Sequence, residues 1–345
     1  MMQIHFTGHS MFEKLLSFKW RALFFLLMPL SVYAQKSSAL RSVQLSYDND
    51  FFNYRGEGTD REYTSGIELD FYYTKNSKSS FLDNLLMELS GTPDNLYEWG
   101  ITQLMFAPNI IANPAIIIGD RPYAGILYLN HRLISADIVK KQKITTELDI
   151  GVIGKYSLAE QAQTLAHRII DYQLPKGWDN QIYSDIILNY FIQYERLIAQ
   201  PSSNLEIIGR MESNIGTWKN TFGLGFTFRG GIFNSYFSNY ENSGFRGNAE
   251  KALVNFRKFQ FYFFMRPIFR AVMDDATLQG GFFTHNKSPY ILSKDQITNS
   301  HLEFDYGFVI TNKKVGLSFN EKLKTKEFKE GVNQQVGNIT LTIKL

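Results

Sequence analysis

Long segments in which apolar and polar residues alternate one by one constrain this fold more than any other feature of the sequence. In segment 220–229 one face is small or charged and the other is apolar, through Phe222, Leu224, Phe226 and Phe228. Successive side chains of a β-strand point to opposite faces, so a period of two residues predicts strands with one apolar and one polar face. Segments 205–212 and 339–345 repeat the pattern. The chain is therefore predicted to be all-β.

The length of these segments distinguishes between two all-β folds. Segments 183–199 and 256–273 are far longer than the roughly 5–6 residues usual in soluble sheets. A strand that crosses a bilayer takes about 9–11 tilted residues. The chain has 29 Phe and 19 Tyr, and these recur near segment ends, where aromatic girdles meet the membrane surface. A soluble barrel or sandwich is the alternative, but these features favour a transmembrane barrel.

The number of segments gives the topology. Twelve strands are expected, at 41–51, 60–74, 96–107, 122–139, 141–155, 181–199, 202–216, 219–233, 256–274, 297–312, 314–326 and 334–345. An even number closes an up-and-down antiparallel β-barrel with both termini in the periplasm. Connections 75–95 and 234–255 then fall on the periplasmic side, where turns are normally short. Their length counts modestly against a total of twelve strands.

The first 34 residues have the pattern of an export signal. A basic stretch with Lys14, Lys19 and Arg21 precedes the apolar run 22–32, and Ala34 ends a small-residue cleavage site. The alternative is a membrane anchor, but an apolar run of about 11 residues is shorter than the ~20 that a spanning helix needs. Residues 1–34 are therefore expected to be a signal peptide and 35–345 the outer-membrane barrel domain.

Composition excludes several functional classes. Removing 1–34 takes away three basic residues and Glu13, so the formal charge falls from +3 to about +1, which gives no support to nucleic-acid binding. The absence of cysteine excludes disulfides, thiolate zinc sites and a cysteine nucleophile. The sequence has no G-x-S-x-G, H-E-x-x-H or phosphate-binding glycine motif, and no other segment approaches ~18 consecutive apolar residues.

One segment has helical rather than strand periodicity. Ser157 followed three residues later by Glu160 has the spacing of a capping box, and apolar residues recur at helical intervals behind it. Pro175 and Gly177 are expected to end the helix. It joins the fifth and sixth strands, and odd strands run outward when the N-terminus is periplasmic. We therefore expect a short helix in an extracellular loop.

The same alternation of strand direction collects several polar residues at the extracellular rim. Asn49 and Asp50 end the first strand, Thr64 opens the second, Arg121 precedes the fourth, and His167 lies on the loop helix. Asn and Asp also favour turns, so these side chains can instead be turn formers and rim charges. A loop-helix histidine alone is more often a solvated or packing residue.

These residues carry a resemblance to a known family. Segments 48–52, 59–66, 119–125, 163–170 and 178–182 resemble, in order, the lipid A 3-O-deacylase (LpxR-like) outer-membrane family, and the similarity covers essentially the whole mature chain. The resemblance implies a twelve-stranded barrel in the cell outer membrane. It also implies an esterase that removes a 3-linked acyl group from lipopolysaccharide, with water as the nucleophile and calcium assistance.

The resemblance also implies roles for individual residues. His167 matches the general base that takes a proton from water. Asp50 matches the residue tied to the divalent cation, taken as Ca²⁺, which prefers oxygen ligands and polarises the ester carbonyl. Asn49 and Thr64 match polar positions that place water or donate to the oxyanion. Gln163, one helical turn before His167, is expected to support it.

The loop after the third strand departs from the family pattern. The family has a lysine there, whereas 107–115 has none. Transition-state charge would then rest on the cation, on Arg121 or on a backbone amide, or the substrate differs, or activity is weak or lost. The apolar part of this loop, 110–118, is expected either to contact acyl chains or to pack inside the barrel mouth.

Two further functional classes remain as alternatives to a monomeric enzyme acting on lipid A. The first is a non-enzymatic pore or scaffold barrel, although the large loops 156–180 and 275–296 suit an occluded barrel better than an open porin. The second is an outer-membrane phospholipase.

Overall fold

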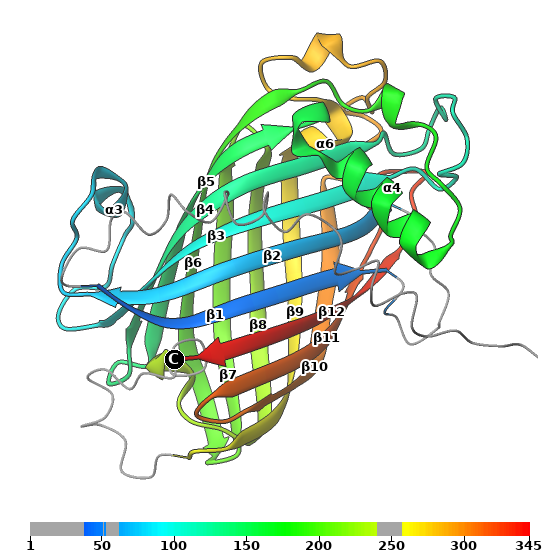
Figure 1. The fold of residues 1–345 in the computed structure, drawn as a ribbon. Coiled ribbons are helices and arrows are strands. Elements are labelled where there is room, and N and C mark those ends of the chain that lie inside the picture. Colours follow the sequence, from blue (N-terminus) through cyan, green and yellow to red (C-terminus); the bar gives the residue numbers. More distant parts are fainter. Residues whose placement is uncertain (1–37, 51, 53–61, 240–256) are drawn as a thin grey trace, which may run out of the picture. The chain divides into compact units, whose positions relative to one another are not determined.

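The described part of the chain folds into one closed barrel. The computed structural model describes residues 38–50, 52, 62–239 and 257–345, and the predicted signal peptide lies outside them. Every strand pairs antiparallel with its neighbours in sequence, and β1 meets β12 to close the barrel (Figure 1). The twelve strands are β1 Ser38–Asn49, β2 Glu62–Lys75, β3 Asp94–Ala107, β4 Ala124–Asp137, β5 Gln142–Ile153, β6 Asp185–Ser202, β7 Leu205–Gly216, β8 Lys219–Ile232, β9 Gln260–Asp275, β10 Ser300–Thr311, β11 Val315–Lys324 and β12 Gln334–Lys344.

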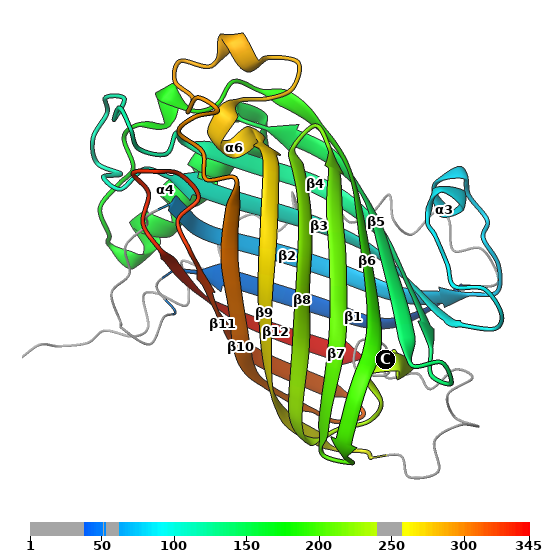
Figure 2. The same cartoon turned by 180° about the vertical axis from the view of Figure 1, so that it is seen from behind.

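The predicted fold class and strand number are thus confirmed, with boundaries shifted by a few residues. Helices occupy only the connections: α3 Phe81–Leu85, α4 Ala159–Ile170, α6 Ala276–Gln279, and the 3₁₀ turns η2 Lys155–Ser157, η3 Trp178–Asn180, η4 Tyr236–Ser238 and η6 His285–Lys287. Among the described residues no helix combines the length and apolarity needed to span a bilayer. Figures 1 and 2 show α4 and α6 at one end of the barrel, the helix end, and the C-terminus at the other.

Burial along the strands is reversed from that of a soluble protein. In β8 the side chains of Phe222, Leu224 and Phe226 are 40–48% exposed, whereas Thr227 and Arg229 are buried. Apolar residues therefore cover the outer wall and polar residues face the interior, as in barrels surrounded by lipid. This arrangement is the physical basis of the alternation seen in the sequence.

Paired charged side chains line a cavity in the barrel interior. Arg270 donates to both carboxylate oxygens of Glu303, at 3.1 Å each, and lies 2.5 Å from an oxygen of Glu212. These side chains border a cavity of about 640 Å³. Buried charges are tolerated only when they are paired in this way.

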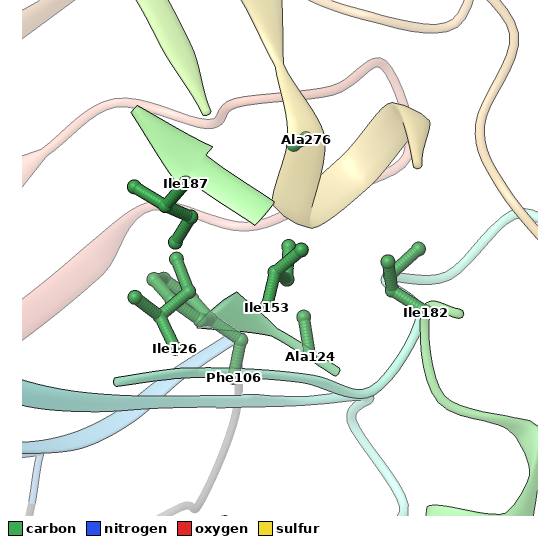
Figure 3. Close-up of a cluster of buried hydrophobic side chains, with 7 residues drawn as sticks. All are labelled: Phe106, Ala124, Ile126, Ile153, Ile182, Ile187 and Ala276. Atoms are coloured by element: carbon green, nitrogen blue, oxygen red, sulfur yellow. The ribbon is translucent and has the colours of Figure 1, made fainter. Parts of the chain in front are cut away.

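An apolar cluster narrows the interior at the helix end. Its seven buried side chains come from β3 to β6, the α6 segment and the chain before β6, and they point toward one another in Figure 3: Phe106, Ala124, Ile126, Ile153, Ile182, Ile187 and Ala276. The guanidinium of Arg121 lies over the Phe106 ring, 4.6 Å from its centroid. Packed apolar side chains therefore fill part of the barrel interior at this end.

The long connection 76–93 at the other end folds back onto the barrel. Asp83 of α3 accepts from Lys75 at 2.5 Å and lies 2.9 Å from the His131 ring nitrogen Nε2. Burial opposes ionisation of Asp83, but its bonds to Lys75, to His131 and to the backbone of Ser79 hold its pKa below the usual range. This long connection, unusual for the periplasmic side, is stabilised by a buried charge network.

The start of α4 differs from the prediction. Ser157 ends the preceding turn η2, and α4 begins at Ala159. Its N-cap residue is Leu158, which adopts a left-handed conformation at φ 60° and makes no side-chain capping bond. The capping box between Ser157 and Glu160 does not form. The Ser157 hydroxyl is fully buried against the wall glycine Gly125, so packing takes precedence over capping.

The end of α4 also comes earlier than expected. The helix stops at Ile170, where Asp171 turns left-handed at φ 55°, and not at Pro175 or Gly177. Asp171 and the residues after it then return the chain toward the helix, because the Tyr172 N–H donates to the His167 carbonyl at 2.8 Å.

Candidate functional site

Helix α4 packs on the outer wall of the barrel and not in its interior. Ala159 and Ala162 contact a buried cluster that includes Met105 of β3 and Trp178. The helix contacts β3 and β4, at the helix end of the barrel in Figure 1. Gly125 of β4 permits this approach, since a β-carbon there would collide with Ser157 and Ala159. The space between α4 and the wall is thus at the lipid-facing side of the helix end.

The helix turns its polar face toward the barrel. Ala159, Gln163 and His167, spaced four residues apart, are its buried positions, whereas Ile169 and Ile170 are 60% and 67% exposed. A structural helix on a protein surface normally buries its apolar stripe. The reversed orientation places the two polar side chains against the barrel and leaves apolar ones outward.

His167 is held in one tautomer by the chain that follows the helix. Its Nδ1 lies 2.6 Å from the Gln173 carbonyl oxygen, and its ring meets Tyr172 edge-on at 5.2 Å between centroids. A carbonyl oxygen only accepts, so Nδ1 carries the hydrogen and Nε2 of the neutral ring has the lone pair. The residue is 5% exposed. Nε2 is therefore the ring nitrogen that can accept a proton.

Gln163 is also oriented by a single bond. Its Oε1 accepts from the Trp178 indole N–H at 2.8 Å, and its Nε2 is buried with no partner among the described residues. A buried amide donor without an acceptor is unfavourable unless water or a ligand completes it. Gln163 therefore presents a donor on the same helix face as His167.

The strand side of the site comes from the ends of β1 and β2. The Asp50 N–H donates to the Thr64 carbonyl at 3.4 Å, which holds these two residues side by side. The Asn49 amide nitrogen donates to the Tyr47 hydroxyl at 3.1 Å. Tyr47 is 38% exposed on the outer wall, so Asn49 lies on the outer face, as the alternation of β1 predicts.

A β-bulge sets the position of Thr64. Tyr63 pairs with Phe106 and Ser65 with Met105, so Thr64 is the extra residue between them. Bulges re-aim side chains and are common beside active sites. The Thr64 hydroxyl is buried and has no partner among the described residues. Since Met105 also packs in the α4 cluster, the bulge lies next to the helix.

The structure thus places Asn49, Asp50, Thr64, Gln163 and His167 in neighbouring elements at the helix end. Residues 51 and 53–61, which join β1 to β2, lie outside the described residues.

Arg121 is located elsewhere. Its side chain is fully buried in the mouth, where it donates to Glu327 at 3.0 Å and to the Thr277 hydroxyl at 3.1 Å. Glu327 and Phe106 both border the interior cavity. The guanidinium is therefore part of the mouth closure, and the structure does not bring it together with His167.

The apolar loop after β3 follows neither of its two expected arrangements completely. Ile111 is buried beside Tyr123 and Trp178 in the α4 cluster. The Tyr123 hydroxyl and the Lys176 N–H both donate to the Ile111 carbonyl, at 2.9 Å. Ile110 and Ile118, by contrast, are 59% and 78% exposed. The loop anchors the α4 segment and also presents apolar side chains.

Sequence reasoning missed the groups that orient the site. The Gln173 carbonyl has no side-chain signal, because any residue supplies a backbone carbonyl. Trp178 was noted only through the family resemblance, and nothing in its spacing shows that its indole binds Gln163.

The oxygen atoms on the strand side suit a hard cation. Asp50 offers a carboxylate, Asn49 an amide oxygen, and Thr64 a buried hydroxyl oxygen without a partner among the described residues. Calcium prefers such oxygen donors, with water completing the shell. The residues present therefore fit the group that the family resemblance implies.

Comparison with solved structures shows which known proteins have a similar fold. The solved structure of LpxR from Salmonella typhimurium matches with a TM-score of 0.68 and 21% identity, covering 88% of this chain and 100% of that one. The β domain of the Bordetella autotransporter BrkA (0.44, 8% identity) and the NanC porin (0.36, 7% identity) each match 89% of this chain and 100% of their own. A search of curated proteins gave no match.

The family model described as outer membrane protein LpxR matches residues 20–345. Because this match spans nearly the whole chain, the protein belongs to the LpxR family of outer membrane proteins.

Proposed function

We propose that this protein is an outer-membrane lipid A deacylase that hydrolyses a 3-linked acyl ester of lipopolysaccharide. The observation that carries the proposal is His167, buried on the barrel-facing side of α4 with its Nδ1 bonded to the Gln173 carbonyl and its Nε2 kept as a base. Family membership supports the same activity.

The chemistry follows from these groups. Nε2 of His167 takes a proton from water as the water oxygen attacks the ester carbonyl, and the Gln173 carbonyl stabilises the resulting imidazolium through Nδ1–H. The imidazolium returns the proton to the leaving alkoxide, which gives a free fatty acid and an alcohol. The Thr64 hydroxyl and the Gln163 amide, both unpartnered among the described residues, supply donors for the oxyanion.

Calcium is proposed as the cofactor at the strand side. Asp50 would hold it with Asn49 and Thr64, and when bound it would supply positive charge near the reacting carbonyl. This compensates for the lysine that the loop 107–115 lacks.

The position of the site suits a lipid substrate. Helix α4 packs on the outer wall, and its exposed side chains Ile169 and Ile170 are apolar. Acyl chains in the outer leaflet can therefore reach the site laterally without entering the barrel. The closed mouth argues against an open pore.

The test is mass spectrometry of lipid A from cells that express the protein, with calcium present. The wild type should release an acyl group, and His167→Ala should lower this activity by on the order of 10²–10⁴-fold. His285→Ala, at an exposed loop histidine, is the matched control.

Unchanged lipid A in the wild type, or full activity in His167→Ala, would refute the proposal. Phospholipids extracted from the same cells distinguish the phospholipase alternative, since lysophospholipid should not accumulate.

A further inference from the structure

A second group of carboxylates lies inside the barrel, away from the outer-wall site. One oxygen from each of Glu68, Asp70 and Glu98 lies within 4.8 Å of the other two. We call these three residues, from β2 and β3, the interior acidic cluster. Asp70 and Glu98 are fully buried, and Glu68 borders the interior cavity.

The cluster has fewer positive charges than its carboxylates need. Arg132 of β4 lies 2.7 Å from Glu98 and 3.5 Å from Glu68, and it also pairs with Glu147 of β5. Asp70 forms no ion pair in the part of the chain that the structure describes, and neither does the buried Asp149 of β5. Five carboxylates thus share one guanidinium, and uncompensated buried charges are strongly unfavourable.

Independent of the carboxylates, an amide oxygen points into the same space. The Asn130 amide nitrogen donates to Glu98 at 2.6 Å, which fixes the orientation of the amide. Its oxygen is fully buried and has no donor among the described residues, and the same holds for Oδ1 of Asp70. Both oxygens lie where a β-carbon on Gly100 would be, the Asn130 oxygen at 2.6 Å from that position. Two acceptor oxygens with no donor between them are stabilised by a cation that both can bind.

We propose that the interior acidic cluster and Asn130 together bind a calcium ion. Carboxylate and amide oxygens are the ligands that calcium prefers, at about 2.3–2.6 Å, so opposite ligands lie about 4.6–5.2 Å apart. The cluster oxygens fall within such a sphere. Magnesium demands shorter distances and a stricter octahedron. Water from the cavity beside Glu68 completes the shell and gives the ion a route in.

The ion would join three neighbouring strands. Asp70 of β2 pairs with Gly100 of β3, and Gly100 pairs with Asn130 of β4. The bound charge replaces repulsion across this part of the wall with attraction. The ion is therefore expected to stabilise the barrel without taking part in ester hydrolysis.

The experiment measures calcium binding and thermal unfolding of the full protein, purified from outer membranes in detergent and treated with EDTA. Calcium should raise Tm of the wild type by several degrees, because a ligand bound only by the folded state stabilises it. Asp70→Asn should lose the part of this rise that the interior ion supplies and bind one equivalent of calcium fewer in equilibrium dialysis. Asp50→Asn should keep the rise and lose deacylation, so the interior site and the proposed catalytic site fail separately.

The difference in Tm between wild type and Asp70→Asn should change sign between EDTA and calcium. In EDTA, Asp70→Asn should unfold at the same temperature as the wild type or higher, because it removes an unpaired buried charge. In calcium the wild type should be the more stable. Gly100→Ala, which fills the space without changing charge, should also lose the calcium response, with Gly230→Ala as the control where a β-carbon meets nothing within 4 Å.

Three outcomes would overturn the proposal. The first is a calcium response that survives in Asp70→Asn and Gly100→Ala but disappears in Asp50→Asn. The second is Asp70→Asn lowering Tm equally in EDTA and calcium, which indicates a proton or hydrogen-bond role. The third is an equal rise in Tm with magnesium, which would contradict the assignment of the site to calcium.

Discussion

At the scale of single residues, hydrogen bonds orient the polar side chains of the candidate site. The Nδ1–H of His167 donates to the Gln173 carbonyl, and Oε1 of Gln163 accepts from the Trp178 indole N–H. Each side chain is thereby held in one orientation. Thr64 is the strand-side counterpart, since its buried hydroxyl has no partner among the described residues. Such atoms are rare in folded proteins unless a ligand completes them.

Thr64→Val is the corresponding prediction, because it removes the hydroxyl and keeps the shape. Deacylation should fall by on the order of 10²-fold, the usual loss for one oxyanion donor, while Tm stays close to that of the wild type. Thr227→Val is the control: that interior threonine hydroxyl is also buried and unpartnered among the described residues. Equal activity in both variants would exclude a role for the Thr64 hydroxyl.

At the scale of elements, the position of α4 depends on glycine in the wall beneath it. A β-carbon on Gly125 would overlap Ser157 and Ala159, so a larger residue must push the helix away from the barrel. Because α4 carries His167, the proposed base, and Asn49, Asp50 and Thr64 lie at the ends of β1 and β2, a shift of the helix should separate them. Misplacement of this kind lowers catalysis without disrupting the barrel.

Gly125→Val is therefore expected to lower deacylation strongly and to speed tryptic cleavage after the exposed Arg168 of α4. The barrel should keep the heat-modifiable mobility of a folded protein on gels, since overpacking typically costs about 1–3 kcal/mol. Gly230→Ala, where the space is open, should behave as wild type. Unchanged cleavage and activity in Gly125→Val would show that α4 does not need this close contact.

At the scale of the whole molecule, the mouth is held closed by charges as well as by the apolar cluster. Glu327 accepts from Arg121 at 3.0 Å and from Gln334 at 2.9 Å, and it pairs with Lys324. Burial opposes ionisation of Glu327, but Lys324, Arg121 and Lys219 outweigh it and hold its pKa well below the usual range. Its charge therefore stabilises the folded state.

Glu327→Gln leaves the buried Arg121 and the partly buried Lys324 without their carboxylate partner and should cost about 3–5 kcal/mol. We expect a lower Tm and new conductance in planar bilayers as the mouth loosens. Glu321→Gln is the control, since that buried carboxylate bonds to Tyr306 and Gln335 and forms no ion pair among the described residues.

The pH dependence of this variant follows from the lowered pKa of Glu327. A depressed pKa means that the stabilisation is complete above the ordinary value of about 4.3 and disappears as the pH falls through the folded-state value. The difference in Tm between wild type and Glu327→Gln should stay constant above about pH 5 and shrink below pH 4. A constant difference down to pH 2 would contradict the ion-pair explanation.

The sequence by itself determined the barrel, because membrane strands must alternate residue by residue between lipid and interior, and this period is visible in segments such as 220–229. It also indicated which residues share the rim, since strand direction alternates. The wrong start of α4 at Ser157 shows the limit of local patterns: a buried contact with Gly125 took the hydroxyl away from capping.

Only the tertiary structure decided that the site lies on the outer wall, that Arg121 closes the mouth, and that Asp70 and Asn130 share one space beside Gly100. These facts depend on which side chains from strands and loops far apart in sequence meet, and on which polar atoms are left without partners there. Periodicity predicts which face of a strand or helix a residue lies on, whereas its contacts with distant residues depend on the tertiary structure.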